Sequence, residues 1–192
     1  MFQIRIHGRA GQGAKTIAQF LAEAGIKAGK FVQAFPSFGP ARTGAPMNAF
    51  VRLSDYPINL YSEVRKPDAV LVIDPLLIES EEIVRGLKSG LFLVNSAPKE
   101  KIKKQLFRKG LDAGTKIVFL PASKIALAEI NKDVPNTVLL GALVGLTEIV
   151  RMDDLLTAVK SNKKFDPETT ENNLKLIRAG YQYVKEKKFY EK

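Results

Sequence analysis

The sequence contains no cysteine among its 192 residues. A disulfide bond, a thiolate nucleophile and an iron–sulfur cluster bound by this chain are therefore excluded, because each of them needs cysteine sulfur. The single histidine, His7, excludes a metal site built from several histidines and leaves one residue that could serve a Ser-His-Asp triad. We expect no metal site. His7 is either a hydrogen-bonded residue at a strand end or a ligand contact.

Long hydrophobic runs are also missing. No apolar stretch approaches the ~20 residues that a membrane span requires. Residues 1–30 lack the basic start, apolar middle and small-residue cleavage site of a signal peptide. We therefore expect a cytoplasmic protein with no membrane partner, built as a single domain over residues 1–192.

Acidic residues are fewer than basic ones, and the net charge is +10. Residues 99–109 carry six basic residues and one acidic residue, and residues 160–192 carry nine and five. Such segments are usually solvated helix faces, but they also suit an anionic ligand or an acidic protein. The chain has no nucleic-acid-binding motif and few aromatic residues among the basic ones, so a nucleic-acid partner is not expected.

The most informative feature that is present is a glycine-rich loop near the start of the chain. A strand pattern over residues 2–7 is followed by Gly8, Gly11 and Gly13, and an amphipathic helix pattern then covers residues 14–28. The N-terminus of a helix offers unpaired N–H groups and the positive end of the helix dipole. This order predicts an anion site for a phosphate or carboxylate, and the alternative is a tight turn that binds nothing.

The spacing of the glycines argues against the two best-known phosphate loops. The loop reads G-x-x-G-x-G, which reverses the dinucleotide-binding pattern G-x-G-x-x-G. Gly8 and Gly13 have the separation of a Walker loop, but Ala14 is inserted before Lys15 and Thr16. One extra residue rotates a helical side chain by roughly 100°, so Lys15 and Thr16 would miss their positions on the phosphates and Mg²⁺.

Strand and helix patterns alternate along the rest of the chain, which predicts an α/β fold with a mostly parallel sheet flanked by helices. We expect a Rossmann-like three-layer arrangement with a helical C-terminal segment, residues 150–192, packed on it. The expected strands cover residues 2–7, 31–35, 47–53, 69–73, 91–95 and 116–120; helices are expected at 14–28, 83–88, 98–109, 122–131, 136–149 and from 153 and 167 onward. Gly141 and Gly145 would let another backbone approach the helix at 136–149, either in the core or at a subunit interface.

Ligands of such sheets bind at the carboxyl ends of the strands. We expect the Gly8–Gly13 loop to meet two other features there: the segment from Ser37 to Gly44, and Asp74. Residues 36–46 contain three prolines and two glycines and predict an irregular loop with Arg42 at its centre. Arg42 is either a structural ion-pair partner or an anion clamp, and Asp74 is either a helix-start residue or a ligand contact.

These motifs together resemble one known family. The segments H-G-R-A-G-Q-G-A at 7–14, Q-A-F-P at 33–36 and F-G-P-A-R-T-G-A-P at 38–46 are similar to the gamma subunits of the 2-oxoacid:ferredoxin oxidoreductases. V-I-D at 72–74 and the segment from P-N-T at 135–137 to Gly141-Ala142 also fit, so the likeness runs over nearly the whole chain. Many relatives have Arg-Gly-Gly where this chain has Arg42-Thr43-Gly44, a form similar to the pyruvate-type members.

The resemblance implies a subunit that is inactive alone and supplies no catalytic residue. In the family, the whole enzyme decarboxylates a 2-oxoacid to an acyl-CoA and CO₂ and reduces ferredoxin. The alpha, beta and delta subunits would be partners, and they would carry thiamine diphosphate and the [4Fe–4S] clusters. This chain would bind no cofactor alone but would contribute to contacts with coenzyme A. The residues carried over by position are Gly8, Arg9, Gly11, Gln12, Gly13, Arg42, Thr43 and Gly44.

Two other functions stay open at this point. One is a stand-alone nucleotide- or phosphate-binding α/β protein, and the other is a purely structural subunit. Pyruvate is the favoured substrate of the whole enzyme, with 2-oxoisovalerate and 2-oxoglutarate as alternatives.

Overall fold

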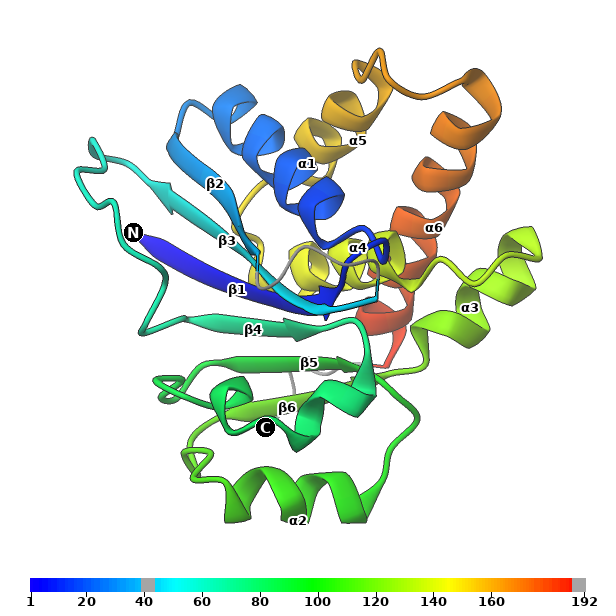
Figure 1. The fold of residues 1–192 in the computed structure, drawn as a ribbon. Helices are drawn as coiled ribbons and strands as arrows, with labels where there is room; N and C mark the ends of the chain where they lie inside the picture. The colour runs from blue at the N-terminus through cyan, green and yellow to red at the C-terminus, as the bar shows by residue number, and fades with distance from the viewer. Residues whose placement is uncertain (39–43, 188–192) are drawn as a thin grey trace.

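The protein is a six-stranded sheet with helices on both faces, described here from a computed structural model over residues 1–38 and 44–187. The strands are β1 (Phe2–Arg9), β2 (Phe31–Phe38), β3 (Pro46–Ser54), β4 (Ala69–Val72), β5 (Leu91–Asn95) and β6 (Lys116–Leu120). The α-helices are α1 (Ala14–Lys27), α2 (Glu100–Arg108), α3 (Ala122–Ile130), α4 (Pro135–Thr147), α5 (Met152–Lys160) and α6 (Pro167–Glu186). In Figure 1 the chain begins in the interior strand β1, passes through α1 to the edge strand β2 and returns through β3, and then adds β4, β5 and β6 on the other side of β1.

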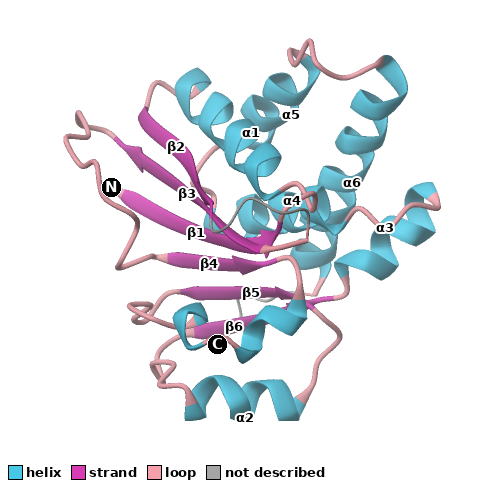
Figure 2. Ribbon diagram, in the orientation of Figure 1, coloured by secondary structure: helices cyan, strands magenta, loops and turns pink. Residues whose placement is uncertain are grey.

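The sheet has the order β2-β3-β1-β4-β5-β6. The pairs β1–β4, β4–β5 and β5–β6 are parallel, whereas β3 lies antiparallel to both β1 and β2. The predicted α/β fold with a mostly parallel sheet is therefore confirmed, and β2 and β3 form an antiparallel hairpin at one edge. Strand β1 is the boundary between the two halves (Figure 2).

Side chains alternate sharply across the faces of β1 and β3. Ile4 and Ile6 of β1 join the main hydrophobic core under α1, α4, α5 and α6, together with the odd-numbered residues of β3 from 47 to 53. The other face of β1 and β3 carries mostly polar side chains. We call it the polar hairpin face, after β3 of the β2–β3 hairpin; its members are Gln3, Arg5, His7, Asn48 and Arg52, together with Phe50. Beside it, the corresponding face of β4 and β5 is apolar and forms a second, smaller core.

Helix α4 is a core helix, which resolves the alternatives left open for its glycines. All ten residues from Asn136 to Gly145 are buried. A Cβ on Gly141 would collide with the backbone of Ile177, and one on Gly180 would collide with the backbone of Val138. The two glycines therefore let α4 and α6 pack backbone to backbone.

Two segments differ from the sequence-based expectation. The strand expected at 31–35 continues to Phe38 through Pro36, which is tolerated because β2 is an edge strand whose outer N–H groups need no partner. No α-helix forms at 83–88, where a helix was expected: the 3-10 helix η2 (Glu81–Ile83) ends there and a turn follows. A second 3-10 helix, η1 (Pro75–Glu79), precedes it. Asp74 begins η1, and its carboxylate accepts a hydrogen bond from the N–H of Leu76.

Within the described ranges, no helix has both the length and the apolar character needed to cross a bilayer.

The contact of α4 with α6 gives a test of the core. We expect Gly180→Val to lower the free energy of unfolding by about 3 kcal/mol, because the new side chain overlaps a backbone that cannot move without separating the helices. Urea unfolding followed by circular dichroism measures the change. Arg178→Ala, at an exposed position of α6, should change it by less than about 0.5 kcal/mol. Equal effects of the two substitutions would contradict this packing.

Candidate functional site

The glycine loop connects β1 to α1 and places the N-terminus of α1 at the carboxyl edge of the sheet. Gly13 precedes α1 with a φ of 80°, in the left-handed region that favours glycine. A Cβ on Gly13 would also collide with the side-chain amide of Asn136 in the first turn of α4. Position 13 therefore favours glycine for two reasons: its backbone is left-handed, and the first turn of α4 lies too close for a side chain.

Arg9 holds the loop in place. Its Nε donates to Oδ2 of Asp74 at 2.6 Å, and its Nη1 donates to the carbonyl of Gly44 at 3.1 Å. The backbone N–H of Arg9 donates to Oε1 of Gln12 at 2.7 Å, so the Gln12 side chain folds back onto its own loop. Arg9 and Gln12, both predicted to contact a ligand, have structural partners within the site.

Gly44 and Ala45, which follow the centre of the second predicted loop, lie directly against the first loop. The N–H of Gly44 donates to the carbonyl of Ala10 at 3.2 Å, and the N–H of Ala10 donates to the carbonyl of Ala45 at 2.9 Å. The structure thus brings together the glycine loop, Gly44 and Asp74. Arg42 and Thr43 fall in residues 39–43, outside the described part of the chain.

A cavity of about 400 Å³ opens beside the glycine loop. The N-termini of α1 and α4 both border it through Gly13 and Asn136, and each offers N–H groups that the helix itself cannot pair. Its lining residues come from the ends of β1, β4 and β5 and the starts of α3 and α4: Gly11, Gln12, Gly13, Ile73, Asp74, Pro75, Asn95, Ser123, Asp133, Val134, Pro135 and Asn136.

Asn136 is a buried polar side chain of this cavity whose amide oxygen lacks a partner among the described residues. It is 6% exposed, and its buried Oδ1 has no hydrogen-bond partner among the described residues. Asn95 differs, because its amide donates to the carbonyl of Ile73 and to Oγ of Ser123, and its Oδ1 accepts from the N–H of Ser123. A buried amide oxygen left unpaired costs free energy, and Asn136 lines the cavity, so a ligand that reorients this side chain would restore a hydrogen bond to it.

The cavity combines donors with acceptors. The two helix N-termini attract negative charge. The carboxylate of Asp74 is neutralised by Arg9, and that of Asp133 is exposed at the rim. The arrangement suits a ligand that carries both an anionic group and hydroxyl or amide hydrogens.

Lys15 does not line this cavity, and its side chain is exposed. This agrees with the interpretation that the inserted Ala14, which is buried, turns Lys15 away from the site of a Walker lysine. Four residues that line the cavity were not predicted from the sequence: Asn95, Ser123, Asp133 and Asn136. They follow a buried strand or lie at the start of a helix, and these positions were the sequence features that could have indicated them.

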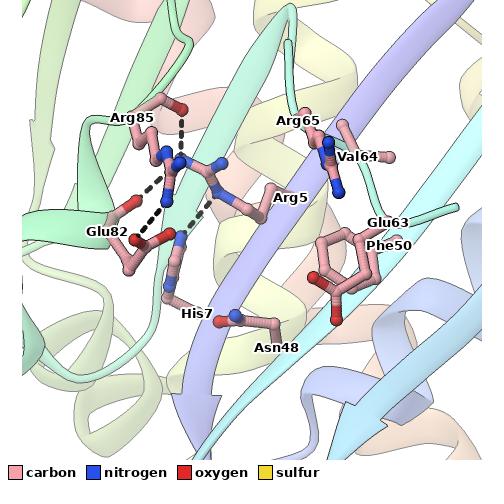
Figure 3. A pocket seen from close by; sticks show the side chains of 9 residues that line it. All are labelled: Arg5, His7, Asn48, Phe50, Glu63, Val64, Arg65, Glu82 and Arg85. Carbon is pink, nitrogen blue, oxygen red and sulfur yellow. Dashed lines mark hydrogen bonds and ion pairs between the residues drawn. The ribbon is translucent and has the colours of Figure 1, made fainter.

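His7 lies on the polar hairpin face, on the other side of the sheet from the main core. Its Nε2 accepts a hydrogen bond from Nε of Arg5 at 2.9 Å (Figure 3). Burial, together with the charge of Arg5, lowers the pKa of His7 to about 3. The imidazole is therefore neutral and carries its proton on Nδ1. Of the two interpretations of His7, the structure shows the hydrogen-bonded strand residue.

The family model, the similar sequences and the similar solved structure all indicate the same family. The family model described as pyruvate ferredoxin/flavodoxin oxidoreductase matches residues 3–183. Pyruvate synthase subunit PorC from Thermotoga maritima is 46% identical over 187 residues, covering 96% of this chain and 95% of that protein. The pyruvate/ketoisovalerate oxidoreductases common subunit gamma from Pyrococcus abyssi is 40% identical over 183 residues, covering 95% and 96%. The crystal structure of pyruvate oxidoreductase subunit PORC from Thermotoga maritima superimposes with a TM-score of 0.79 at 43% identity, covering 94% of this chain and 95% of that one.

The lowered pKa of His7 predicts how stability depends on pH. Below pH 6.5 the unfolded chain binds a proton at His7 that the folded chain does not bind until about pH 3. The free energy of unfolding should therefore fall by about 1 kcal/mol per pH unit from this residue as pH drops from 6 toward 3. His7→Gln keeps an acceptor for Arg5 but cannot titrate, so the difference between the two proteins isolates the effect. Equal slopes, or an imidazole NMR titration near pH 6.5, would contradict the buried neutral state.

Proposed function

This chain belongs to the pyruvate ferredoxin/flavodoxin oxidoreductase family, and we propose that it is the gamma subunit of a 2-oxoacid:ferredoxin oxidoreductase whose substrate is pyruvate. The observation that carries the proposal is the near full-length match to relatives named as subunits of such enzymes. The complex converts pyruvate and coenzyme A to acetyl-CoA and CO₂. The two electrons released pass to ferredoxin.

The redox and decarboxylation chemistry belongs to partner subunits in this proposal. A [4Fe–4S] cluster does not fit this chain, because the chain has no cysteine to ligate iron. The alpha, beta and delta subunits would therefore hold the clusters and thiamine diphosphate. The choice of 2-oxoacid would also lie with them, since the relative from Pyrococcus abyssi is named as common to pyruvate and ketoisovalerate enzymes.

The contribution of this chain is to bind part of coenzyme A in the cavity beside the glycine loop. The phosphate groups of coenzyme A are anionic, and two helix N-termini converge there. Hydroxyl and amide hydrogens of the same ligand would meet the unpaired Oδ1 of Asn136 and the rim carboxylate of Asp133. Gly8, Gly11 and Gly13 allow close approach of the loop backbone, while Arg9, Gln12 and Gly44 hold the loop. Arg42 and Thr43 remain part of the proposal through their place beside Gly44 in the sequence.

Two alternatives predict different behaviour. A stand-alone nucleotide-binding protein would bind ATP or a nicotinamide dinucleotide without partners, and the exposed Lys15 argues against a Walker-type site. A purely structural subunit would assemble with its partners but would leave coenzyme A binding unaffected by changes at the glycine-loop cavity.

Substitution of Asn136 tests the coenzyme A site. In the assembled enzyme, Asn136→Ala should raise the KM for coenzyme A about tenfold, because one buried hydrogen bond to the ligand is lost. The KM for pyruvate should stay within about twofold. Asn172→Ala on α6 is the matched control and should change neither constant.

Two results would contradict the proposal at different points. An unchanged KM for coenzyme A in Asn136→Ala would favour the purely structural subunit. Turnover of pyruvate by this chain alone, or purification of the native protein without thiamine- and cluster-bearing partners, would contradict the assignment as a subunit.

A further inference from the structure

A second cavity, of about 270 Å³, lies on the polar hairpin face, away from the glycine loop. It is walled by β1 and β3, by residues 63–65 of the coil that joins β3 to β4, and by the segment around η2 (Figure 3). The lining residues are Arg5, His7, Asn48, Phe50, Glu63, Val64, Arg65, Glu82 and Arg85.

Arg5 is a buried cation without a carboxylate partner. It is 5% exposed, and no described carboxylate forms an ion pair with it. Its Nη2 donates to the backbone carbonyls of Glu82, Ile83 and Arg85 at 3.0, 3.2 and 2.9 Å, and its Nε donates to His7. Carbonyl oxygens satisfy hydrogen bonds but carry no formal charge. A buried charge is costly unless an opposite charge compensates it.

Arg5 and two neighbouring side chains, His7 and Asn48, also have N–H groups that donate no hydrogen bond among the described residues. Within the described chain, Nη1 of Arg5 donates no hydrogen bond, and neither does Nδ1–H of His7. The side-chain amide of Asn48, which pairs in register with His7, has no hydrogen-bond partner there either. These donors surround one cavity, so an acceptor with negative charge fits it.

The two carboxylates at the rim, Glu82 and Glu63, attract the charge of Arg5 from a distance, but neither forms an ion pair with its guanidinium among the described residues. Glu82 pairs with Arg85 at 2.7 Å on the surface, where both side chains are largely exposed. Oε1 of Glu63 accepts a hydrogen bond from Oγ of Ser37 in β2. Arg65 is exposed and forms no ion pair among the described residues. The lining of the cavity therefore contains three arginines and two glutamates, so its formal charge is positive.

Three large side chains are exposed in the coil that leads from β3 to the cavity-lining residues 63–65. Tyr56 is 78% exposed, Leu60 43% and Tyr61 94%. Helix α1 packs on the opposite face of this hairpin, as Figure 1 shows. Exposed tyrosines and arginines on one segment are typical of a protein–protein interface.

We propose that a carboxylate side chain of a partner subunit enters this cavity and becomes the counterion of Arg5. The inference rests on the proposed function, since it needs the chain to be a subunit of a complex. The exposed tyrosines favour a protein partner over a free carboxylate, because they would remain in water around a small ligand. The net charge of +10 favours a partner with an acidic surface.

Asn48→Asp is the sharpest variant, because it puts a carboxylate inside the cavity with almost no change in shape. The new charge would take the place of the partner's carboxylate beside Arg5. We expect association with the thiamine- and cluster-bearing subunits to weaken about tenfold or more, while the isolated chain keeps or gains thermal stability. Asn162→Asp is the matched control: the same chemical change falls in the turn after α5, where Oδ1 accepts the N–H of Lys164.

His7 supplies an independent readout as the sole histidine of the chain. Specific labelling of histidine gives one imidazole spectrum, which should change when the wild-type chain joins its partners. Asn48→Asp should shift the same resonances in the isolated chain. If Asn48→Asp fails to fold, Arg65→Glu on the exposed rim should weaken assembly by a similar factor.

The outcomes separate the two proposals. Normal assembly of Asn48→Asp and Arg65→Glu overturns the cavity as a docking site and leaves the proposed function intact. Failure of the wild-type chain to assemble with the other subunits overturns the proposed function and this inference with it. Saturation of the His7 shift by sub-millimolar acetate in the isolated chain, with assembly unaffected by the variants, would assign the cavity to a free carboxylate instead.

Discussion

The register of strand β1 sets the faces of both halves of the sheet. The strand pairs in parallel with β4 and antiparallel with β3, so it joins a parallel α/β half to an antiparallel hairpin. Its even-numbered positions Ile4 and Ile6 enter the main core, and its odd-numbered positions Arg5 and His7 face the other way. A shift of one residue in its register would bury Arg5 in the main core and expose the isoleucines.

The two candidate binding regions follow from this one strand. Its carboxyl end leads into the glycine loop, where helix N-termini provide unpaired donors for an anionic ligand. Its polar side chains, midway along the strand, build the cavity around Arg5 on a sheet face without a large helix over it. The proposed ligand site and the proposed docking site thus use different side chains of the same strand and its loop. His7 and Arg9 are two residues apart, yet one faces the docking cavity and the other holds the loop.

The sequence was sufficient for the fold class and for most of the strands and helices, because amphipathic helices have a clear period and the buried strands are short apolar runs between turn residues. It also predicted the meeting of the glycine loop, Gly44 and Asp74, since the carboxyl ends of parallel strands share an edge. It did not predict the extension of β2 through Pro36, because edge position depends on strand order. The unpaired oxygen of Asn136 and the isolated charge of Arg5 were also not predictable, since both depend on which distant residues pack beside them.

Hydrogen–deuterium exchange on the assembled enzyme shows whether the ligand and the partner contact different sides of β1. Addition of coenzyme A should slow exchange in residues 8–13 and 133–138 and leave residues 55–67 unchanged. Assembly of the chain with its partner subunits should slow exchange in residues 55–67 and 80–86. Protection of residues 55–67 by coenzyme A, without an effect at residues 8–13, would contradict the account.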